Sequence, residues 1–255
     1  MSLELFRLDD RVAIITGSSR GLGKAMASAL AGAGAKVVIT SRHLNEAQAT
    51  ADEIKNSTGR IAIALEVDVS QQPQVERLVN QTLSEFGRID ILINNAGLNI
   101  RGPIEELKMD DWTQVLNTNL IGPILCCQAV APHMKAQKYG RVINIASILG
   151  LIGMPNRTPY SASKGAVIQL TRTLALEWAP YNITVNAICP GPFATEMNRP
   201  LMDDPQVYQT FVSKVPLGRW GEPKEIGGVA IFLASEASSF VTGATIYVDG
   251  GYTAQ

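Results

Sequence analysis

The hydrophobic residues of this chain form short runs that alternate with longer segments of helical periodicity. Seven runs are rich in Val and Ile and nearly continuous in apolar residues, which is typical of strands buried on both faces: residues 12–16, 36–40, 61–67, 89–93, 141–146, 183–188 and 245–249. Between them, apolar residues recur with helical spacing, which predicts helices at residues 23–32, 44–57, 74–86, 110–135, 159–180 and 222–234.

This alternation of strands and helices predicts an α/β fold. Apolar strands separated by helices are typical of a parallel sheet covered on both faces. We therefore expect a single domain over residues 1–255, a Rossmann fold with a doubly wound, seven-stranded parallel sheet. Ligands of such a sheet bind at the carboxyl ends of the strands, where the winding reverses. Residues 193–220 contain helical pieces but no strand, and we expect them to form a helical lid over that crevice.

Composition and charge narrow the class of protein. The chain has 22 Lys and Arg against 23 Asp and Glu, a net charge of −1, and no block of like charge. This balance argues against nucleic acid or an anionic membrane as a partner. Because no segment approaches 18 uninterrupted apolar residues, we do not expect a membrane span. Cys126, Cys127 and Cys189 form no metal or redox motif and are expected to pack in the core of a cytoplasmic protein.

Residues 16–23, T-G-S-S-R-G-L-G, fit two different sites. Gly17, Ser19 and Gly21 match the G-x-S-x-G turn of a serine hydrolase, whereas Gly17, Gly21 and Gly23 match a glycine loop that binds a dinucleotide. Both sites require a strand before the loop and a helix after it, and both are predicted here. The loop by itself does not distinguish the two functions.

The histidines of the chain decide against the hydrolase. A doubly wound hydrolase needs a histidine late in the chain, but the only histidines are His43 and His133. In the cofactor interpretation, the first glycine allows a tight turn, the second lets the backbone approach a pyrophosphate, and the third lets the helix pack closely. The hydroxyls of Ser18 and Ser19 can add donors.

Tyr160 and Lys164 are the strongest candidates for acid–base chemistry. They lie four residues apart in a helix that Thr158 is expected to cap and Pro159 to begin, so their side chains should share one face. A free phenol has a pKa of about 10, and catalysis near neutral pH needs a value of roughly 7 to 8. We expect the ammonium of Lys164 and the helix N-terminus to lower the pKa of Tyr160.

Two more polar residues fall near the same crevice in the predicted fold. Ser147 follows the strand at 141–146, so its hydroxyl should reach the crevice and bind a substrate oxygen. Asn119 lies within the helix at 110–135, where a buried asparagine often only satisfies backbone groups.

The end of the second predicted strand indicates which nicotinamide cofactor would bind. An acid at this position accepts the ribose hydroxyls of NAD, whereas a basic residue accommodates the 2′-phosphate of NADP. Here the strand ends at Ser41 and Arg42, and Arg20 lies in the glycine loop. Because guanidinium groups form charge-assisted hydrogen bonds to phosphate, the sequence favours NADP(H).

Five motifs in order resemble those of the short-chain dehydrogenase/reductase family. They are T-G-x-x-x-G-x-G at 16–23, N-N-A-G at 94–97, Asn119 in N-L-I-G, Ser147 with Y-S-A-S-K at 160–164, and P-G-P-F-A-T at 190–195. The resemblance runs from about Asp10 to Gly251.

That resemblance implies roles for these residues. Tyr160 would be the general acid and base, Ser147 would orient the carbonyl or alcohol, Lys164 would hold the nicotinamide ribose, and Asn119 would support a water. It also implies a homotetramer, with the helices at 110–135 and 159–180 as contact surfaces. The cofactor would lie against Leu22, Asp68, Val69, Asn95, Ala96, Gly97, Pro190, Gly191 and Thr195 as well as the glycine loop.

The substrate is less well defined by the sequence. Arg101, Arg157 and Phe193 flank the expected site, and either arginine could pair with a carboxylate or phosphate, or simply face water. The second half of the chain resembles gluconate 5-dehydrogenases, which implies a sugar acid or polyol as substrate. It is also similar to 3-oxoacyl-carrier-protein reductases. A dinucleotide-binding regulatory protein without turnover is a third possibility, although it would have no chemical need for Ser147, Tyr160 and Lys164 together.

Overall fold

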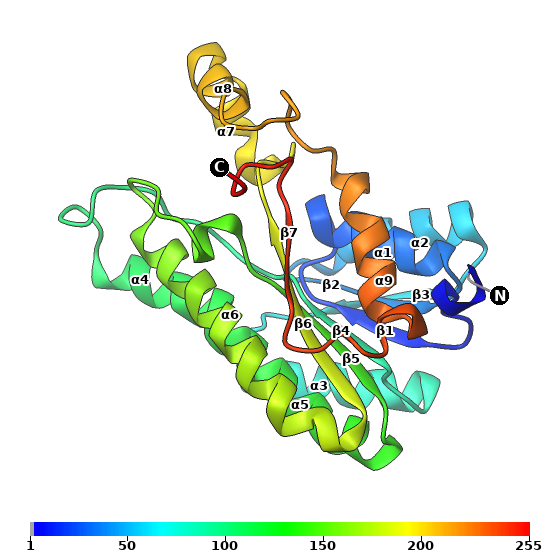
Figure 1. Ribbon diagram of the computed structural model, residues 1–255. Coiled ribbons are helices and arrows are strands. Elements are labelled where there is room, and N and C mark those ends of the chain that lie inside the picture. The colour runs from blue at the N-terminus through cyan, green and yellow to red at the C-terminus, as the bar shows by residue number, and fades with distance from the viewer. Residues whose placement is uncertain (1–2) are drawn as a thin grey trace.

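A parallel seven-stranded sheet forms the centre of the computed structural model, which describes residues 3–255 (Figure 1). Its strand order is β3-β2-β1-β4-β5-β6-β7, and every neighbouring pair is parallel. The order reverses between β1 and β4, which places the ligand crevice of a doubly wound sheet there. The strands are β1 (Val12–Ile15), β2 (Lys36–Ser41), β3 (Ala62–Glu66), β4 (Ile91–Asn94), β5 (Gly140–Ile145), β6 (Ile183–Pro190) and β7 (Thr245–Val248).

Helices cover both faces of this sheet, as the sequence predicts. On one face, α1, α2 and α9 contribute Leu30, Ile54 and Leu233 to a buried apolar cluster. On the other face, α3 and α5 contribute Leu78 and Val130 to a second cluster, and α6 packs beside α5 (Figure 1). The helices are α1 (Gly21–Gly32), α2 (Leu44–Thr58), α3 (Gln72–Phe86), α4 (Met109–Leu116), α5 (Gly122–Gln137), α6 (Thr158–Trp178), α7 (Arg199–Met202), α8 (Pro205–Val212) and α9 (Gly227–Ala234).

Two long helices differ from the sequence-based expectation. The helix expected at 110–135 is continuous in direction but contains a π-helical turn, Asn117–Ile121, between α4 and α5. Such turns are rare and often lie at functional sites. The helix expected at 222–234 begins as a 3₁₀ turn, Pro223–Ile226, before α9. The spacing of hydrophobic residues does not distinguish α, π and 3₁₀ turns, because each of them brings residues three to five positions apart onto similar faces.

The start of α6 differs from the expectation that Thr158 caps this helix. Arg157, not Thr158, is the residue before the helix, and Thr158 and Pro159 are its first two residues. No side chain caps this end. The hydroxyl pattern predicted the cap one residue too late, but the position of Pro159 in the first turn agrees with its missing N–H.

A charged cluster ties β1 to β4 at the amino ends of these strands, away from the crevice. The carboxylate of Asp90 is fully buried and accepts hydrogen bonds from the backbone N–H of Val12 at 3.0 Å and from Arg88 at 2.6 and 2.8 Å. Arg11 also approaches Asp90, at 3.3 Å. Because Asp90 precedes β4 and Val12 begins β1, this carboxylate fixes the two central strands to each other.

By length and composition, the stretch Met109–Gln137 is apolar enough to cross a membrane. In the structure it belongs to the core instead. Cys126, Cys127, Val130 and Met134 are buried against the sheet. The side of this stretch that faces the sheet is therefore part of the core, although only 39% of its most apolar window is buried.

Candidate active site

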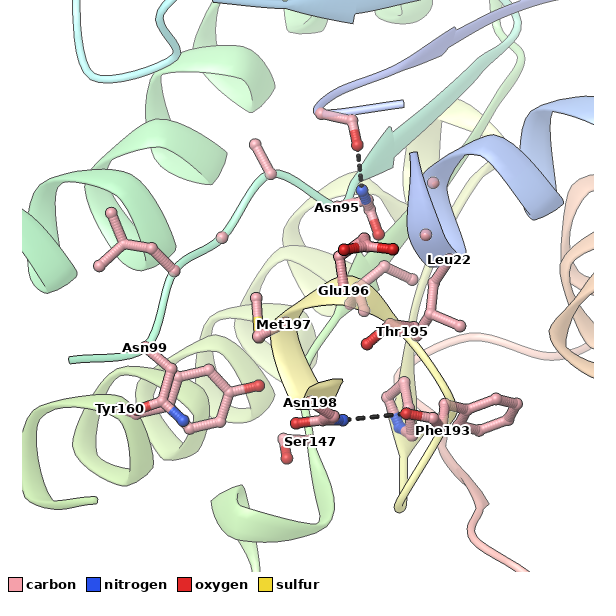
Figure 2. A pocket seen from close by; sticks show the side chains of 18 of the residues that line it. Leu22, Asn95, Asn99, Ser147, Tyr160, Phe193, Thr195, Glu196, Met197 and Asn198 are labelled. Atoms are coloured by element: carbon pink, nitrogen blue, oxygen red, sulfur yellow. Dashed lines mark hydrogen bonds between the residues drawn. The ribbon is translucent and has the colours of Figure 1, made fainter. Parts of the chain in front are cut away.

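A cavity of about 800 Å³ opens at the carboxyl ends of the strands. It is bounded by the glycine loop, the ends of β4, β5 and β6, the start of α6 and the 193–220 segment. Figure 2 shows Leu22 and Thr195 on one side of this cavity and Tyr160 on the other. Apart from Ser18, the cavity wall contains the residues that the sequence predicts for the cofactor or substrate: Gly17, Ser19, Arg20, Gly21, Leu22, Gly23, Ser41, Arg42, Asp68, Val69, Asn95, Ala96, Gly97, Arg101, Ser147, Arg157, Tyr160, Lys164, Pro190, Gly191, Phe193 and Thr195.

The geometry of the glycine loop fits a pyrophosphate. Gly17 and Gly21 have φ values of +60° and +58°, which side chains rarely adopt. A Cβ on Gly17 would lie 2.8 Å from the Cα of Ala96, whereas one on Gly21 would meet only Thr195, at an ordinary contact distance of 3.8 Å. No side chain caps the N-terminus of α1. Its first N–H groups are therefore available to an anion, and Gly21 lets that anion approach the backbone.

Gly23 holds the loop in shape. A Cβ here would lie 2.4 Å from the Nδ2 of Asn95 and 2.5 Å from the carbonyl oxygen of Gly17. That same Nδ2 donates hydrogen bonds to the carbonyl oxygens of Thr16 and Gly17, both at 2.9 Å, and the Gly17 bond needs the space that Gly23 leaves. Asn95 therefore has a structural role in addition to its place in the cavity wall.

The two serines of the glycine loop, Ser18 and Ser19, have different surroundings. The hydroxyl of Ser18 is buried and donates to the carbonyl oxygen of Ile15 at 2.7 Å, so it does not add a donor to the cavity as expected. Ser19 does face the cavity, and its hydroxyl donates to Glu46 at 3.3 Å.

Ser147 and Tyr160 meet at the other end of the cavity. Ser147 is held by the backbone N–H of Leu149, which donates to its Oγ at 3.1 Å. Burial raises the pKa of Tyr160, and the nearby hydroxyl of Ser147 opposes that effect. The direction is the opposite of the sequence-based expectation, because burial outweighs the nearby charges.

Lys164 lies close to Tyr160 but does not contact its hydroxyl. Its Nζ donates to the carbonyl oxygen of Ile145 at 2.6 Å and lies 5.6 Å from the centre of the Tyr160 ring. Burial lowers the pKa of Lys164 to about 8. The expected sharing of one helix face is confirmed, and the ammonium is placed to interact with a group bound between itself and the phenol.

Asn119 lies behind the cavity wall and is not part of it. Its Oδ1 accepts from the backbone N–H of Leu98 at 2.9 Å, and its Nδ2 donates to the carbonyl oxygen of Leu98 at 2.9 Å and to Ser163 at 3.1 Å. These three bonds fix the loop after β4 to α6. In this structure the side chain of Asn119 positions the cavity wall.

Two arginines, Arg101 and Arg157, line the cavity together with Tyr160. Burial lowers the pKa of both, and the positive charge of Arg101 adds to this effect at Arg157. Arg101 donates to the carbonyl oxygen of Met197 at 3.1 Å, while its Nε is buried without a hydrogen-bond partner in residues 3–255. The Oδ1 of Asn99 is likewise buried and unpartnered in the described chain. This end of the cavity can therefore accept a polar, negatively charged group.

Sequence reasoning missed several residues of the cavity wall. Their signal was weak, because single polar or apolar residues in loops have no periodicity. The 193–220 segment does border the cavity, as expected, and supplies many of them. The additional residues include Glu46, Asn99, Met154, Glu196, Met197, Asn198, Leu201, Phe211 and Trp220. Among residues 3–255, no group of three or more His, Cys, Asp or Glu side chains is placed to hold a metal ion.

Comparison with known proteins identifies the family. A family model described as enoyl-(acyl carrier protein) reductase matches residues 17–253. The 2-dehydro-3-deoxy-D-gluconate 5-dehydrogenase of Formosa agariphila is 38% identical over 100% of this chain and 97% of its own length. The 3-oxoacyl-[acyl-carrier-protein] reductase of Synechocystis is 42% identical over 96% of this chain and 97% of its own.

A solved structure agrees in fold and in sequence. The gluconate 5-dehydrogenase of Burkholderia cenocepacia, in complex with NADP and tartrate, superposes with a TM-score of 0.96 and 43% identity, covering 100% of both chains. The chain is therefore an oxidoreductase that belongs to the short-chain dehydrogenase/reductase family.

Proposed function

We propose that this protein is an NADP(H)-dependent oxidoreductase that interconverts the carbonyl and secondary alcohol of a sugar acid. The substrate class is inferred from Arg101 and Arg157, which line the cavity together with Tyr160. The Nε of Arg101 is buried and has no hydrogen-bond partner within residues 3–255. A carboxylate would satisfy these donors. The Burkholderia enzyme, whose structure is a complex with NADP and the dicarboxylate tartrate, supports the same assignment.

The chemistry follows from where the reacting groups lie. When bound, the nicotinamide supplies or accepts the hydride. Tyr160 donates its phenolic proton to the carbonyl oxygen during reduction and recovers it during oxidation. Ser147 lines the cavity together with that phenol and can orient the same substrate oxygen. The ammonium of Lys164 favours the phenolate form, which offsets the cost of desolvation at the moment the proton leaves.

A 3-oxoacyl-carrier-protein reductase is the second candidate, favoured by the Synechocystis relative and by the matching family model. Assays with NADPH and a panel of carbonyl substrates distinguish these two candidate functions. We expect oxidation of NADPH with 5-keto sugar acids and little with 3-oxoacyl thioesters. Turnover of thioesters alone would establish the second candidate, and no turnover of any carbonyl compound would indicate a protein that only binds the cofactor.

Replacing Arg101 tests the carboxylate site. We expect Arg101→Ala to raise KM for a keto acid by about tenfold to a hundredfold, the effect of a lost charge-assisted hydrogen bond. Steady-state kinetics with NADPH measure this. Arg172→Ala, an exposed arginine on the same helix as Tyr160, is the matched control. An equal rise in KM for a neutral ketone would contradict a role in carboxylate binding.

Replacing Arg42 tests the preference for NADP(H) over NAD(H). Arg20 and Arg42 are exposed on the cavity wall and form no ion pair within residues 3–255. We expect Arg42→Ala to weaken NADPH binding by about tenfold and to leave NADH binding nearly unchanged. Fluorescence titration gives both constants, and Lys55→Ala on α2 controls for the loss of one positive charge. Equal losses for both cofactors would show that Arg42 does not contact the 2′-phosphate.

The proposal includes a cytoplasmic homotetramer. Exposed apolar side chains on the long helices, such as Ile121 and Leu176, support contacts between copies there. Figure 1 shows α4, α5 and α6 as an uncovered layer on one face of the sheet. Analytical ultracentrifugation measures the assembly, and a stable monomer would refute it.

A further inference from the structure

Glu46 places a carboxylate at the end of the cavity where the sequence predicts a phosphate. It is the third residue of α2 and lines the cavity with Ser19, Ser41 and Arg42. Its Oε2 accepts hydrogen bonds from the hydroxyl of Ser19 at 3.3 Å and from the hydroxyl of Ser41 at 3.2 Å. One oxygen of Glu46 therefore holds the hydroxyl of Ser19 in the glycine loop and the hydroxyl of Ser41 at the end of β2.

These contacts are not those of a helix cap. A glutamate at the third helical position usually accepts from the backbone N–H of the residue before the helix. Here that N–H belongs to His43, and it donates to the Oγ of Ser41 at 3.2 Å. The carboxylate of Glu46 is turned instead to the glycine loop and the end of β2, where it is only partly exposed.

Its charge is not neutralised by the nearby arginines. Within residues 3–255, neither Arg20 nor Arg42 has a carboxylate oxygen within 4 Å, so Glu46 is bound through neutral hydroxyls only. An anion that approached the two arginines at this end would meet an uncompensated negative charge. It would also compete with Glu46 for Ser19 and Ser41.

We propose that Glu46 determines cofactor specificity by opposing the preference for NADP(H) over NAD(H); this inference rests on the proposed function. A phosphate monoester carries a charge of about −1.5 to −2 at neutral pH, so the carboxylate repels it. A ribose 2′-hydroxyl is neutral and can donate to the same carboxylate. Glu46 thus favours NAD(H), while Arg20 and Arg42 favour NADP(H).

The substitution Glu46→Gln tests this with little change in shape. Glutamine keeps an acceptor for one serine hydroxyl but removes the charge. We expect the Kd for NADPH, measured by fluorescence titration in the absence of substrate, to fall by about tenfold. The Kd for NADH should stay the same or rise. Glu53→Gln removes one charge from the same helix, at an exposed ion pair with Lys24, and should change neither constant.

Two results would overturn the inference. The inference fails if Glu46→Gln leaves the affinity for NADPH unchanged or lowers it, or if it raises the affinity for both cofactors equally. Glu46 would then have only a structural role at the start of α2. A thermal unfolding curve without cofactor shows whether the variant is folded, and Glu46→Ala repeats the test if it is not. If the wild-type protein binds neither cofactor, the proposed function fails as well; if it binds NADPH and the variants match it, the inference alone fails.

Discussion

Tyr160→Phe is expected to lower kcat by about a thousandfold while leaving the Kd for NADPH within about twofold, because general acid–base catalysis contributes roughly 10² to 10⁴ in rate. Phenylalanine keeps the ring that packs beside Ser147 and Lys164 but has no proton to give. The loss therefore falls on turnover.

The measurement is single-turnover oxidation of NADPH with a saturating keto acid, together with a cofactor titration. Tyr181→Phe is the matched control, because Tyr181 is exposed and lies outside the cavity wall, beyond α6. Turnover within about tenfold of wild type, or a loss of NADPH binding as large as the loss of rate, would mean that Tyr160 is not the acid.

Asp90→Ala is expected to reduce the free energy of unfolding by about 3 to 5 kcal/mol, because it leaves the buried N–H of Val12 unsatisfied and removes charge-assisted hydrogen bonds from partly exposed arginines. The carboxylate is fully buried, and the change would leave Arg11, Arg88 and the N–H of Val12 without their acceptor. A loss of this size lowers Tm by on the order of 10 °C in a chain of this length.

Urea unfolding followed by circular dichroism measures the change as a shift in midpoint with an unchanged slope. Asp52→Ala on the exposed face of α2 is the control and should stay within about 0.5 kcal/mol of wild type. A loss below about 1 kcal/mol for Asp90→Ala would show that water satisfies the arginines equally well.

The sequence predicted the fold and most of the cavity wall for a physical reason. Parallel strands buried on both faces must be apolar along their length, so β1 and β6 are visible in the pattern. Residues that follow strand ends reach the same edge of the sheet, so Ser147 and Asn95 could be placed in one crevice without coordinates. The chemistry of Tyr160 and Lys164 follows from helical spacing.

What the sequence could not supply depends on contacts between distant segments. The bonds of Asn119 to Leu98 and Ser163 follow from a π turn that hydrophobic spacing does not reveal. The direction of the Tyr160 pKa depends on desolvation, which a spacing rule does not include. The sequence carries no signal for Glu46, because only the fold brings its carboxylate to Ser19.

The three cysteines of the core make the folded enzyme suitable for site-specific labelling. Cys126, Cys127 and Cys189 are buried, and burial raises the pKa of the Cys127 thiol to about 12 and that of Cys189 to about 11. Thiolates are the species that alkylating dyes attack, so these native thiols should stay unmodified. A cysteine introduced at exposed Met197 could then carry a fluorophore that reports motion of the 193–220 segment, without removing any native cysteine.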